Sequence, residues 1–387
     1  MMIVSPPPLS LYIHLPWCVR KCPYCDFNSH ALRAALPEDP YVDALLRDLT
    51  ADAPLVEGRT VQTVFLGGGT PSLFSPEAIA RLLTGVRDRV ALAPDAEVTL
   101  EANPGTVEVS RFRGFREAGV NRLSIGIQSF DPAKLQTLGR IHGREEATAA
   151  ADAARAARFD NFNLDLMYAL PDQSVEQALS DVRTALAAAP THLSLYQLTL
   201  EPNTAFYRAP PQLPDEETIE TMEKTLIGEL QRAGFVQYEV SAYALAGKEC
   251  RHNRNYWEFG DYLGIGAGAH AKISSHAAVT RTVKVRHPEA FLHAAGSAGA
   301  RASSRVVASG ELPFEFMLNA LRLRDGFAVS LFTERTGLSF DCIETPTDRA
   351  RERGLLVLEN DSIRASALGR RFLNDLVGLF LPASASG

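Results

Sequence analysis

The chain has 387 residues, 46% of them hydrophobic and 22% charged, with a formal net charge of -7 at pH 7. This length allows one large α/β domain and a smaller second domain. A negative balance does not suit general nucleic-acid binding, which needs a basic surface, so no nucleic-acid partner is expected.

The chain also lacks signals for export or membrane insertion. Its first ten residues, MMIVSPPPLS, have neither the basic start nor the apolar core of a signal peptide, and no apolar run reaches the length of about 18 residues that a membrane span needs. Five cysteines, three of them clustered, do not form a disulfide framework in a chain of this length. We therefore predict a soluble, cytoplasmic protein.

Short apolar runs rich in β-forming residues alternate with helical patterns along the first half of the chain. The expected strands are residues 9–15, 61–66, 97–101, 122–127, 161–167 and 192–198. Helical spacing and start signals predict helices between most of them, among others at residues 76–90, 144–158 and 175–190. This alternation predicts right-handed βαβ units in a parallel sheet, either an open partial barrel or a doubly wound sheet.

From about residue 311 the pattern changes to short helices followed by a hairpin. Residues 314–323 form a helical run, two further helical patterns follow, and GLLVLENDSIRAS predicts two strands around a turn at Asn360–Asp361. Three helices with a hairpin resemble a winged helix. Because residues 311–380 contain nine Arg and no Lys against eleven Asp and Glu, we expect a packing or lid domain and not a DNA-binding one.

Several polar residues and glycines lie where the predicted strands end. Cys18 follows the first strand, residues 67–70 follow the second, Glu101 ends the third, Gln128 ends the fourth, and Asp165 lies within the fifth. In both candidate folds, ligands bind at the carboxyl ends of the strands. The sequence therefore predicts a ligand site at this edge of the sheet.

The segment CVRKCPYCDF holds three cysteines, Cys18, Cys22 and Cys25, in a C-x₃-C-x₂-C spacing, and Phe27 stands where a fourth might follow. A 4Fe–4S cluster usually takes one thiolate per iron. Three cysteines would hold such a cluster and leave one iron open for a small molecule. Tyr24, beside the last cysteine, would shield the cluster from water.

Other uses of these cysteines stay open at this point. A zinc ion would need a further ligand such as His14 or His30, although zinc sites usually combine two separated ligand pairs. A redox pair would need only two thiols, and plain structural cysteines are a further alternative. The two remaining cysteines, Cys250 and Cys342, stand alone and are expected to be small buried hydrophobes.

The spacing, with an aromatic residue before the last cysteine, resembles the signature of the radical S-adenosylmethionine (SAM) superfamily. The resemblance narrows to the group of oxygen-independent coproporphyrinogen III oxidases and related haem chaperones. It rests on the motifs YIHLPWCVRKCPYCDF, FLGGGTPS, EANP, RLSIGIQSF, NLDLMYALP, YLGIGAGAH and RHNRNYW, which span nearly the whole chain. It implies an α/β fold with a partial (β/α)₆ barrel and a C-terminal winged-helix-like α+β domain, and a 4Fe–4S cluster on the three cysteines.

The resemblance also assigns residues to SAM. Gly68, Gly69 and Thr70 would line its methionine end, because glycine allows a close approach of the backbone. Glu101 would hold the ammonium group, and the planar guanidinium of Arg140 would hold the carboxylate.

Four further residues complete this implied SAM site. Gln128 and Asp165 would hydrogen-bond the ribose hydroxyls. Tyr12, six residues before Cys18, would contact SAM on the substrate side, and Tyr24 would contact it beside the cluster.

The segment RHNRNYW, residues 251–257, is a second candidate site. By resemblance to the chaperones, His252 would be an axial ligand of haem iron, since neutral imidazole binds iron well, and Tyr256 and Trp257 would supply aromatic surface. The alternative is a capped loop whose polar side chains bond backbone groups and whose Trp257 fills core.

Two functions follow from the resemblance. One is a haem chaperone that binds haem, a 4Fe–4S cluster and SAM and passes haem to an acceptor protein; the alternative is oxidative decarboxylation of coproporphyrinogen III. The oxidases have a further cysteine at the position of Phe27 and a longer segment before the motif than the 17 residues found here, so the chaperone is favoured. Whether the chain is an enzyme is left open.

The expected organisation has three parts. Residues 1–240 would form the radical SAM barrel with the cluster and SAM site, residues 241–305 a connecting segment with the HNxxYW motif, and residues 306–387 the C-terminal domain. The acceptor is unidentified, with a respiratory, membrane-associated protein as one option, and both monomer and dimer stay open.

Overall fold

Six long strands lie side by side, parallel and in chain order, in the computed structural model, which describes residue 3, residues 5–105 and residues 110–382. They are β1 (Leu9–Leu15), β4 (Thr60–Gly68), β5 (Ala91–Ala102), β6 (Arg122–Gln128), β7 (Phe162–Tyr168) and β8 (His192–Gln197). The predicted βαβ alternation is confirmed. Parts of the expected domain ends, residues 1–2, 4 and 383–387, lie outside the described residues.

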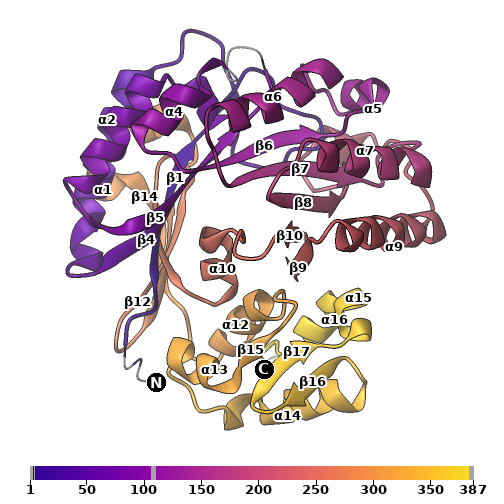
Figure 1. Ribbon diagram of the computed structural model, residues 1–387. Coiled ribbons are helices and arrows are strands. Elements are labelled where there is room, and N and C mark those ends of the chain that lie inside the picture. The colour runs from indigo at the N-terminus through magenta and orange to yellow at the C-terminus, as the bar shows by residue number, and fades with distance from the viewer. Residues whose placement is uncertain (1–2, 4, 106–109, 383–387) are drawn as a thin grey trace.

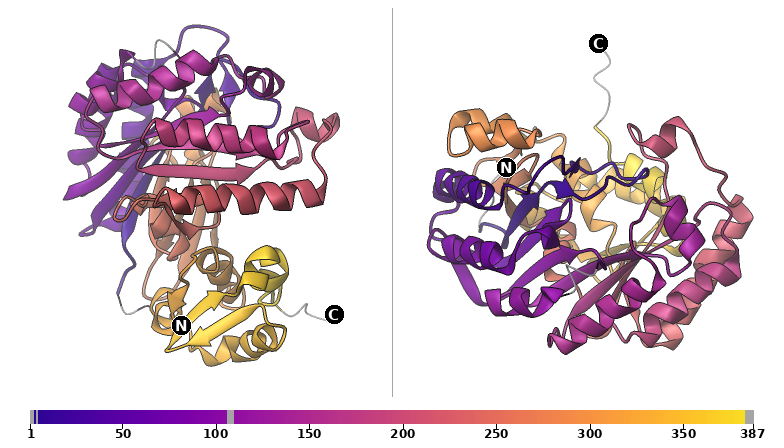
Figure 2. Two further views of the ribbon diagram at one scale, coloured as in Figure 1. Left: turned by 45° about the vertical axis from the view of Figure 1, so that its right-hand side comes forward. Right: turned by 90° about the horizontal axis from the view of Figure 1, so that it is seen from above.

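The helices that connect and follow these strands cover the outer face of the curved sheet, so the fold is an open partial barrel (Figures 1 and 2). They are α1 (Glu38–Asp52), α2 (Pro76–Arg87), α4 (Phe112–Ala118), α5 (Pro132–Thr137), α6 (Arg144–Ala156), α7 (Val175–Ala187), α8 (Ala205–Arg208) and α9 (Glu216–Arg232). Ser75 caps α2, and Ser174 with Gln177 forms the predicted capping box of α7. Leucine, valine and alanine side chains between sheet and helices form one large buried core.

Residues 241–305, whose pattern was poorly readable in the sequence, add further strands to the same sheet. Strand β11 (Asp261–Ile265) pairs parallel with β1, on the side away from β4, and β12 (His270–Ser274), β13 (Val279–Lys284) and β14 (Arg301–Val306) continue it antiparallel. At the other edge, β10 (Ala242–Ala244) and β9 (Val236–Glu239) follow β8. Over the residues that the structure describes, the sheet therefore has twelve strands.

Two helices accompany these added strands. Helix α10 (Arg251–Trp257) lies inside the curve of the sheet, between the barrel and the C-terminal part of the chain (Figure 1), and α11 (Pro288–Ala294) packs near α1. Gly264 in β11 permits a close approach of the next strand, because a Cβ there would lie 1.9 Å from the carbonyl oxygen of His270.

The C-terminal part has its own buried core, centred on Phe316, Phe332 and Ile363. As predicted, three helices precede a hairpin: α12 (Leu312–Ala320), α13 (Val329–Thr336), α14 (Asp341–Glu352), β16 (Leu356–Glu359) and β17 (Ser362–Ala365). Asn360 and Asp361 both have positive φ, as a two-residue hairpin turn requires. Strand β15 (Phe327–Ala328) and two short helices, α15 (Ala367–Arg371) and α16 (Leu373–Gly378), were not expected.

The expectation that the two lone cysteines are buried is confirmed for one of them only. Cys250 is buried as expected, but Cys342 is exposed, because it lies on the outer face of α14. In the part of the chain that the structure describes, no helix is both long enough and apolar enough to cross a bilayer.

A buried ion-pair cluster joins β11 to its neighbours. Asp261, fully buried, accepts hydrogen bonds from Arg59 at 2.9 Å, from Lys272 at 2.9 Å and from the Ser274 hydroxyl at 2.7 Å. Lys272 is itself buried, and burial lowers its pKa to about 8 despite the opposing charge of Asp261. Removing one member would leave a buried charge uncompensated.

We expect Asp261→Ala to destabilise the protein by about 3–5 kcal/mol, because Lys272 and Arg59 lose their shared carboxylate. Asp43→Ala, which removes an exposed ion pair with Arg81, is the matched control and should cost less than about 1 kcal/mol. Denaturant unfolding followed by far-UV circular dichroism measures both changes. Equal, small losses of unfolding free energy in the two variants would show that the buried ion pair stabilises the protein no more than the exposed one.

Candidate functional site

The three-cysteine loop begins directly after β1 and is fixed at both ends. A short parallel pair, β2 (Trp17–Cys18) and β3 (His30–Ala31), brackets the loop, with the His30 amide donating to Pro16 at 2.7 Å and the Leu32 amide to Cys18 at 2.9 Å. Within the loop, the amide of Cys25 donates to the carbonyl of Cys22 at 3.2 Å. The backbone thus holds the three cysteines at the carboxyl edge of the barrel.

These cysteines line a cavity of about 490 Å³, called here the cysteine cavity, together with most of the predicted site residues. Eleven of the thirteen residues proposed from the sequence border it: Cys18, Cys22, Cys25, Tyr24, Gly68, Gly69, Thr70, Glu101, Gln128, Arg140 and Asp165. They come from the ends of successive strands, as the parallel topology requires. The other two, Tyr12 and His252, border neighbouring cavities instead.

The cysteine thiols have polar neighbours of their own. Arg140 Nη1 lies 3.8 Å from Cys22 Sγ, and Ser29 Oγ lies 3.6 Å from Cys25 Sγ. Burial raises the pKa of the Cys18 and Cys25 thiols, while hydrogen bonds with Thr70 and Ser29 act in the opposite direction. Such donors favour the thiolate form, which is the form that binds iron.

The donor set fits a cluster better than one zinc ion. A single zinc ion would need a fourth ligand close to all three thiolates. In a four-iron cube each thiolate instead holds a different iron. Both ring nitrogens of His14 are engaged, since Nδ1 accepts from the Tyr12 hydroxyl at 3.0 Å and Nε2 donates to the Asn28 carbonyl at 2.9 Å.

The glycine loop after β4 brings backbone close to the cysteine loop. A Cβ on Gly69 would lie 2.5 Å from the carbonyl oxygen of Trp17, and Gly68 has a φ of 118°. The Gly69 and Thr70 amides donate to Leu15 and Trp17 at 2.8 and 2.7 Å. A side chain at Gly69 would push the two loops apart, and one at Gly68 would collide with the ring of His14.

Two partly buried carboxylates face the same cavity. Glu101 accepts a hydrogen bond from the Gly68 amide at 3.0 Å, and Asp165 accepts from Ser124 at 3.1 Å and Asn163 at 2.7 Å. Burial, with the nearby charge of Asp165, raises the pKa of Glu101 from 4.5 to about 7, and burial also raises the pKa of Asp165. A cationic ligand in the cavity would relieve this cost by pairing with the ionised carboxylates.

Arg140 is positioned by acceptors that leave part of its guanidinium open. Its Nη2 donates to Asn103 and to the Gly126 carbonyl, both at 2.6 Å, and its buried Nε has no hydrogen-bond partner among the described residues. Gln128, at a positive φ of 70°, accepts from the Tyr196 hydroxyl at 2.7 Å. The Nε of Arg140 can therefore donate a further hydrogen bond to an anionic group.

Asn103 and Tyr196 are among the residues of the cysteine cavity that the sequence analysis missed. Asn103 bridges Arg140 and Thr70, donating to Thr70 Oγ1 at 2.9 Å, and its place in the EANP motif was the available signal. Tyr196, at the end of β8, gave no signal, because an aromatic residue in an apolar strand resembles core.

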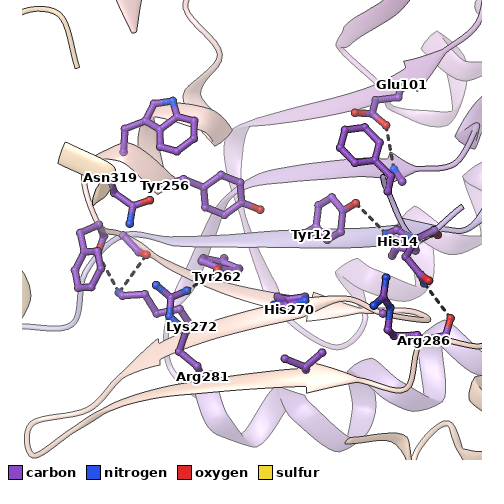
Figure 3. Close-up of a pocket in the computed structure, with 18 residues that line it drawn as sticks. Tyr12, His14, Glu101, Tyr256, Tyr262, His270, Lys272, Arg281, Arg286 and Asn319 are labelled. Atoms are coloured by element: carbon purple, nitrogen blue, oxygen red, sulfur yellow. Dashed lines mark hydrogen bonds between the residues drawn. The ribbon is translucent and has the colours of Figure 1, made fainter. Parts of the chain in front are cut away.

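A second cavity of about 640 Å³, called here the aromatic cavity, adjoins the first (Figure 3). It lies between strands β1, β11, β12 and β13 on one side and α10 on the other, and its aromatic lining residues are Tyr12, Phe27, Tyr256, Trp257, Phe259 and Tyr262. Phe27, Gly68 and Glu101 border both cavities. Glu101 also borders a third, polar cavity of about 240 Å³ inside the barrel.

His252, predicted as a haem ligand, does not line the aromatic cavity, although Tyr256 on the same helix does. Its Nδ1 is hydrogen-bonded to Thr63 Oγ1 at 2.8 Å and its Nε2 to the Tyr256 hydroxyl at 2.9 Å, and it lines the third cavity. Burial lowers the pKa of His252 to about 3, so its ring is neutral. Ligation of iron by His252 stays a prediction, and it would require these hydrogen bonds to break.

Comparison with known proteins places the chain by sequence and by fold. The family model described as the Radical SAM superfamily matches residues 12–185, and the model described as the HemN C-terminal domain matches residues 308–372. Among solved structures, coproporphyrinogen III oxidase (HemN) from Escherichia coli covers 97% of this chain and 90% of its own, with a TM-score of 0.82 at 23% identity. A partial barrel with a cysteine loop at its carboxyl edge thus defines a radical SAM protein.

Relatives with higher sequence identity indicate which family of radical SAM proteins the chain belongs to. The protein named heme chaperone HemW from Escherichia coli (strain K12) is 51% identical over 98% of this chain and 100% of its own length. Relatives of the same name are 46% identical in Haemophilus influenzae, over 97% of this chain and 98% of theirs, and 32% in Bacillus subtilis, over 96% and 99%. The chain belongs to the HemW family of the radical SAM superfamily.

The pKa of Glu101 predicts a pH effect on the stability of the metal-free protein. Because the folded-state pKa is raised from 4.5 to about 7, ionisation of Glu101 opposes folding. Relative to Glu101→Gln, the wild type should therefore lose up to about 3 kcal/mol as the pH rises through this window, at about 1.4 kcal/mol per pKa unit. Denaturant unfolding at about pH 5 and about pH 8 measures the difference.

Glu77→Gln, at an exposed carboxylate on α2, is the control for this pH experiment. A Glu101→Gln profile parallel to that of the wild type would contradict the raised pKa.

Proposed function

We propose that the protein is a haem chaperone that binds haem, holds a 4Fe–4S cluster with SAM, and transfers haem to an acceptor protein. The observation that carries the proposal is the 51% identity, over 98% of this chain, to a protein named heme chaperone HemW. The aromatic cavity beside the cysteine cavity supports it, because such a cavity suits a flat, largely apolar molecule.

Cys18, Cys22 and Cys25 would hold the cluster, with the Arg140 guanidinium beside Cys22 offsetting the negative charge of the thiolates. When bound, the cluster supplies an iron without a protein thiolate and an electron that can cleave SAM. Tyr24, packed against Phe206, would close the cavity to water on this side.

The remaining residues of the cysteine cavity would bind and orient SAM. Ionised Glu101 would take the ammonium group and Arg140 the carboxylate, while Gly68, Gly69 and Thr70 give the backbone room to approach the methionine end.

The ribose and the substrate side would be served by other residues. Gln128 and Asp165 would accept hydrogen bonds from the ribose hydroxyls, and Tyr12, on the wall of the aromatic cavity, would lie between SAM and haem.

The second candidate is an oxygen-independent coproporphyrinogen III oxidase. The fold likeness to that enzyme favours it, but at 23% identity this likeness concerns the fold alone. Phe27, exposed at the boundary of the two cavities, stands where the oxidase resemblance calls for a further cysteine. We therefore rank the chaperone first, acting in the cytoplasm and passing haem to a protein such as a membrane-associated respiratory one.

We expect Cys18→Ala, Cys22→Ala and Cys25→Ala each to lose most of the bound iron after anaerobic reconstitution, because a cube with two thiolates is poorly held. Cys342→Ala, at an exposed and distant cysteine, is the control and should keep its iron. Iron and sulfide analysis with electron paramagnetic resonance of the reduced protein measures the outcome. Full iron in any of the first three variants would remove that cysteine from the cluster.

The function itself is tested by mixing reconstituted protein with haem and with coproporphyrinogen III in separate reactions. We expect a stoichiometric Soret band and transfer of haem to an apo-protein acceptor. With SAM, a reductant and coproporphyrinogen III, we expect no multiple-turnover formation of protoporphyrinogen. Clear turnover would favour the oxidase, and the absence of haem binding would reject the chaperone.

A further inference from the structure

The aromatic cavity has one wall made by a single sheet face. Tyr12 on β1 and Tyr262 on β11 lie in neighbouring strands, and β12 and β13 continue the same face (Figure 3). Tyr256 and Trp257 of α10 form the opposite wall. The space between them, about 640 Å³, falls in the range of cofactor sites, and its aromatic walls suit a flat conjugated ring.

Two histidines line this cavity, His14 and His270, and their ring nitrogens differ. Both nitrogens of His14 are engaged by Tyr12 and by the Asn28 carbonyl. The ring of His270 is exposed at the cavity and makes no hydrogen bond with any described residue. Partial burial, together with the nearby charges of Arg281 and Arg286, lowers the pKa of His270, so a neutral imidazole with an open lone pair faces the cavity.

Strand register fixes the direction of the His270 side chain. His270 and Lys272 are two residues apart on β12 and therefore point to the same face, and His270 pairs with Val283 of β13, which also lines the cavity. In Figure 3, His270 lies between Tyr262 and Arg286. The His270 ring therefore lies on the side of the cavity formed by the sheet, opposite Tyr256 and Trp257 of α10.

The cations at this cavity are not equivalent. Lys272 is held by Asp261 and by backbone carbonyls, and Arg281 is held by Glu315 and the Tyr262 hydroxyl. Arg286 lies just beyond the end of β13, is exposed, and its guanidinium has no hydrogen-bond partner among the described residues. A carboxylate at the mouth of the cavity would find in Arg286 an uncommitted partner.

We propose that haem binds in the aromatic cavity, with His270 as the ligand of its iron and Arg286 paired with a propionate. This inference rests on the proposed function and names the residues that would hold the cargo. The imidazole lone pair forms the bond to iron, so no proton or electron needs to move.

His252 then has a different part. It is a positioning residue: its Nε2 bonds the Tyr256 hydroxyl at 2.9 Å, and the two rings stand edge to face at 4.9 Å between centroids, which fixes the helix wall. Loss of His252 would loosen Tyr256 without removing an iron ligand.

The experiment is a haem titration of the reconstituted full-length protein, read from absorption and resonance Raman spectra. We expect His270→Ala to shift the Soret band and to raise the dissociation constant by about tenfold or more. The control His293→Ala, at an exposed histidine of α11 outside all described cavities, should match the wild type. His252→Ala should keep the iron–imidazole signature while weakening binding by a smaller factor.

A rescue experiment distinguishes a role of His270 as iron ligand from a role in supporting the fold. In His270→Gly, added imidazole should restore the wild-type haem spectrum, which it would not do if His270 merely supported the fold. Arg286→Gln should weaken haem binding by roughly fivefold with an unchanged spectrum, against Arg349→Gln, an exposed arginine on α14, as control.

The outcomes separate the two proposals. A wild-type protein that binds no haem rejects the proposed function and this inference with it. A wild type that binds haem, together with an unchanged spectrum and affinity in His270→Ala, rejects His270 while the chaperone proposal stands. Loss of the iron–imidazole signature in His252→Ala alone would assign the ligand to His252 instead.

Discussion

Strand β11 lies parallel to β1, with Leu9 opposite Asp261 and Ile13 opposite Ile265, and both cavities depend on this pairing. On its other side β1 pairs with β4, so β1 carries the cysteine loop at its end while it forms one wall of the aromatic cavity. The buried carboxylate of Asp261 fixes the start of β11 through Arg59, Lys272 and Ser274. Without this return of the chain to the middle of the sheet, the aromatic residues of α10 and β11 would not face the residues of the barrel.

The cysteine cavity could be predicted from the sequence because its residues follow a local rule. Cys18, Glu101 and Gln128 each lie at or just beyond the end of a strand that alternates with helices, and parallel strand ends must meet at one edge. The aromatic cavity could not be predicted in this way. Strands β11 to β13 are short, and the partner of β11 is more than 240 residues away in the chain, so no local periodicity indicates which face His270 occupies.

The HNxxYW motif identifies its residues but does not predict their hydrogen-bond partners. A sequence gives the identity of His252 but not the partners of its ring nitrogens. One partner, Tyr256, lies one helical turn away on α10, whereas the other, Thr63, comes from β4 and is fixed only by tertiary packing. Asn255 of the same motif donates to Ser10 on β1 and to the Asp261 carbonyl, both at 2.9 Å. Much of the motif therefore ties α10 to the sheet.

Glu101 borders all three cavities; it is partly buried, and among the described residues its carboxylate accepts a hydrogen bond from the Gly68 amide alone. A charge that enters one cavity changes the free energy of ionising Glu101, and through it the electrostatic potential in the others. Thermodynamic linkage makes such an effect reciprocal: if occupation of the cysteine cavity strengthens binding in the aromatic cavity, occupation of the aromatic cavity strengthens binding in the cysteine cavity by the same factor. When charged ligands occupy both cavities, a single shared carboxylate would couple their binding without requiring any movement of the backbone.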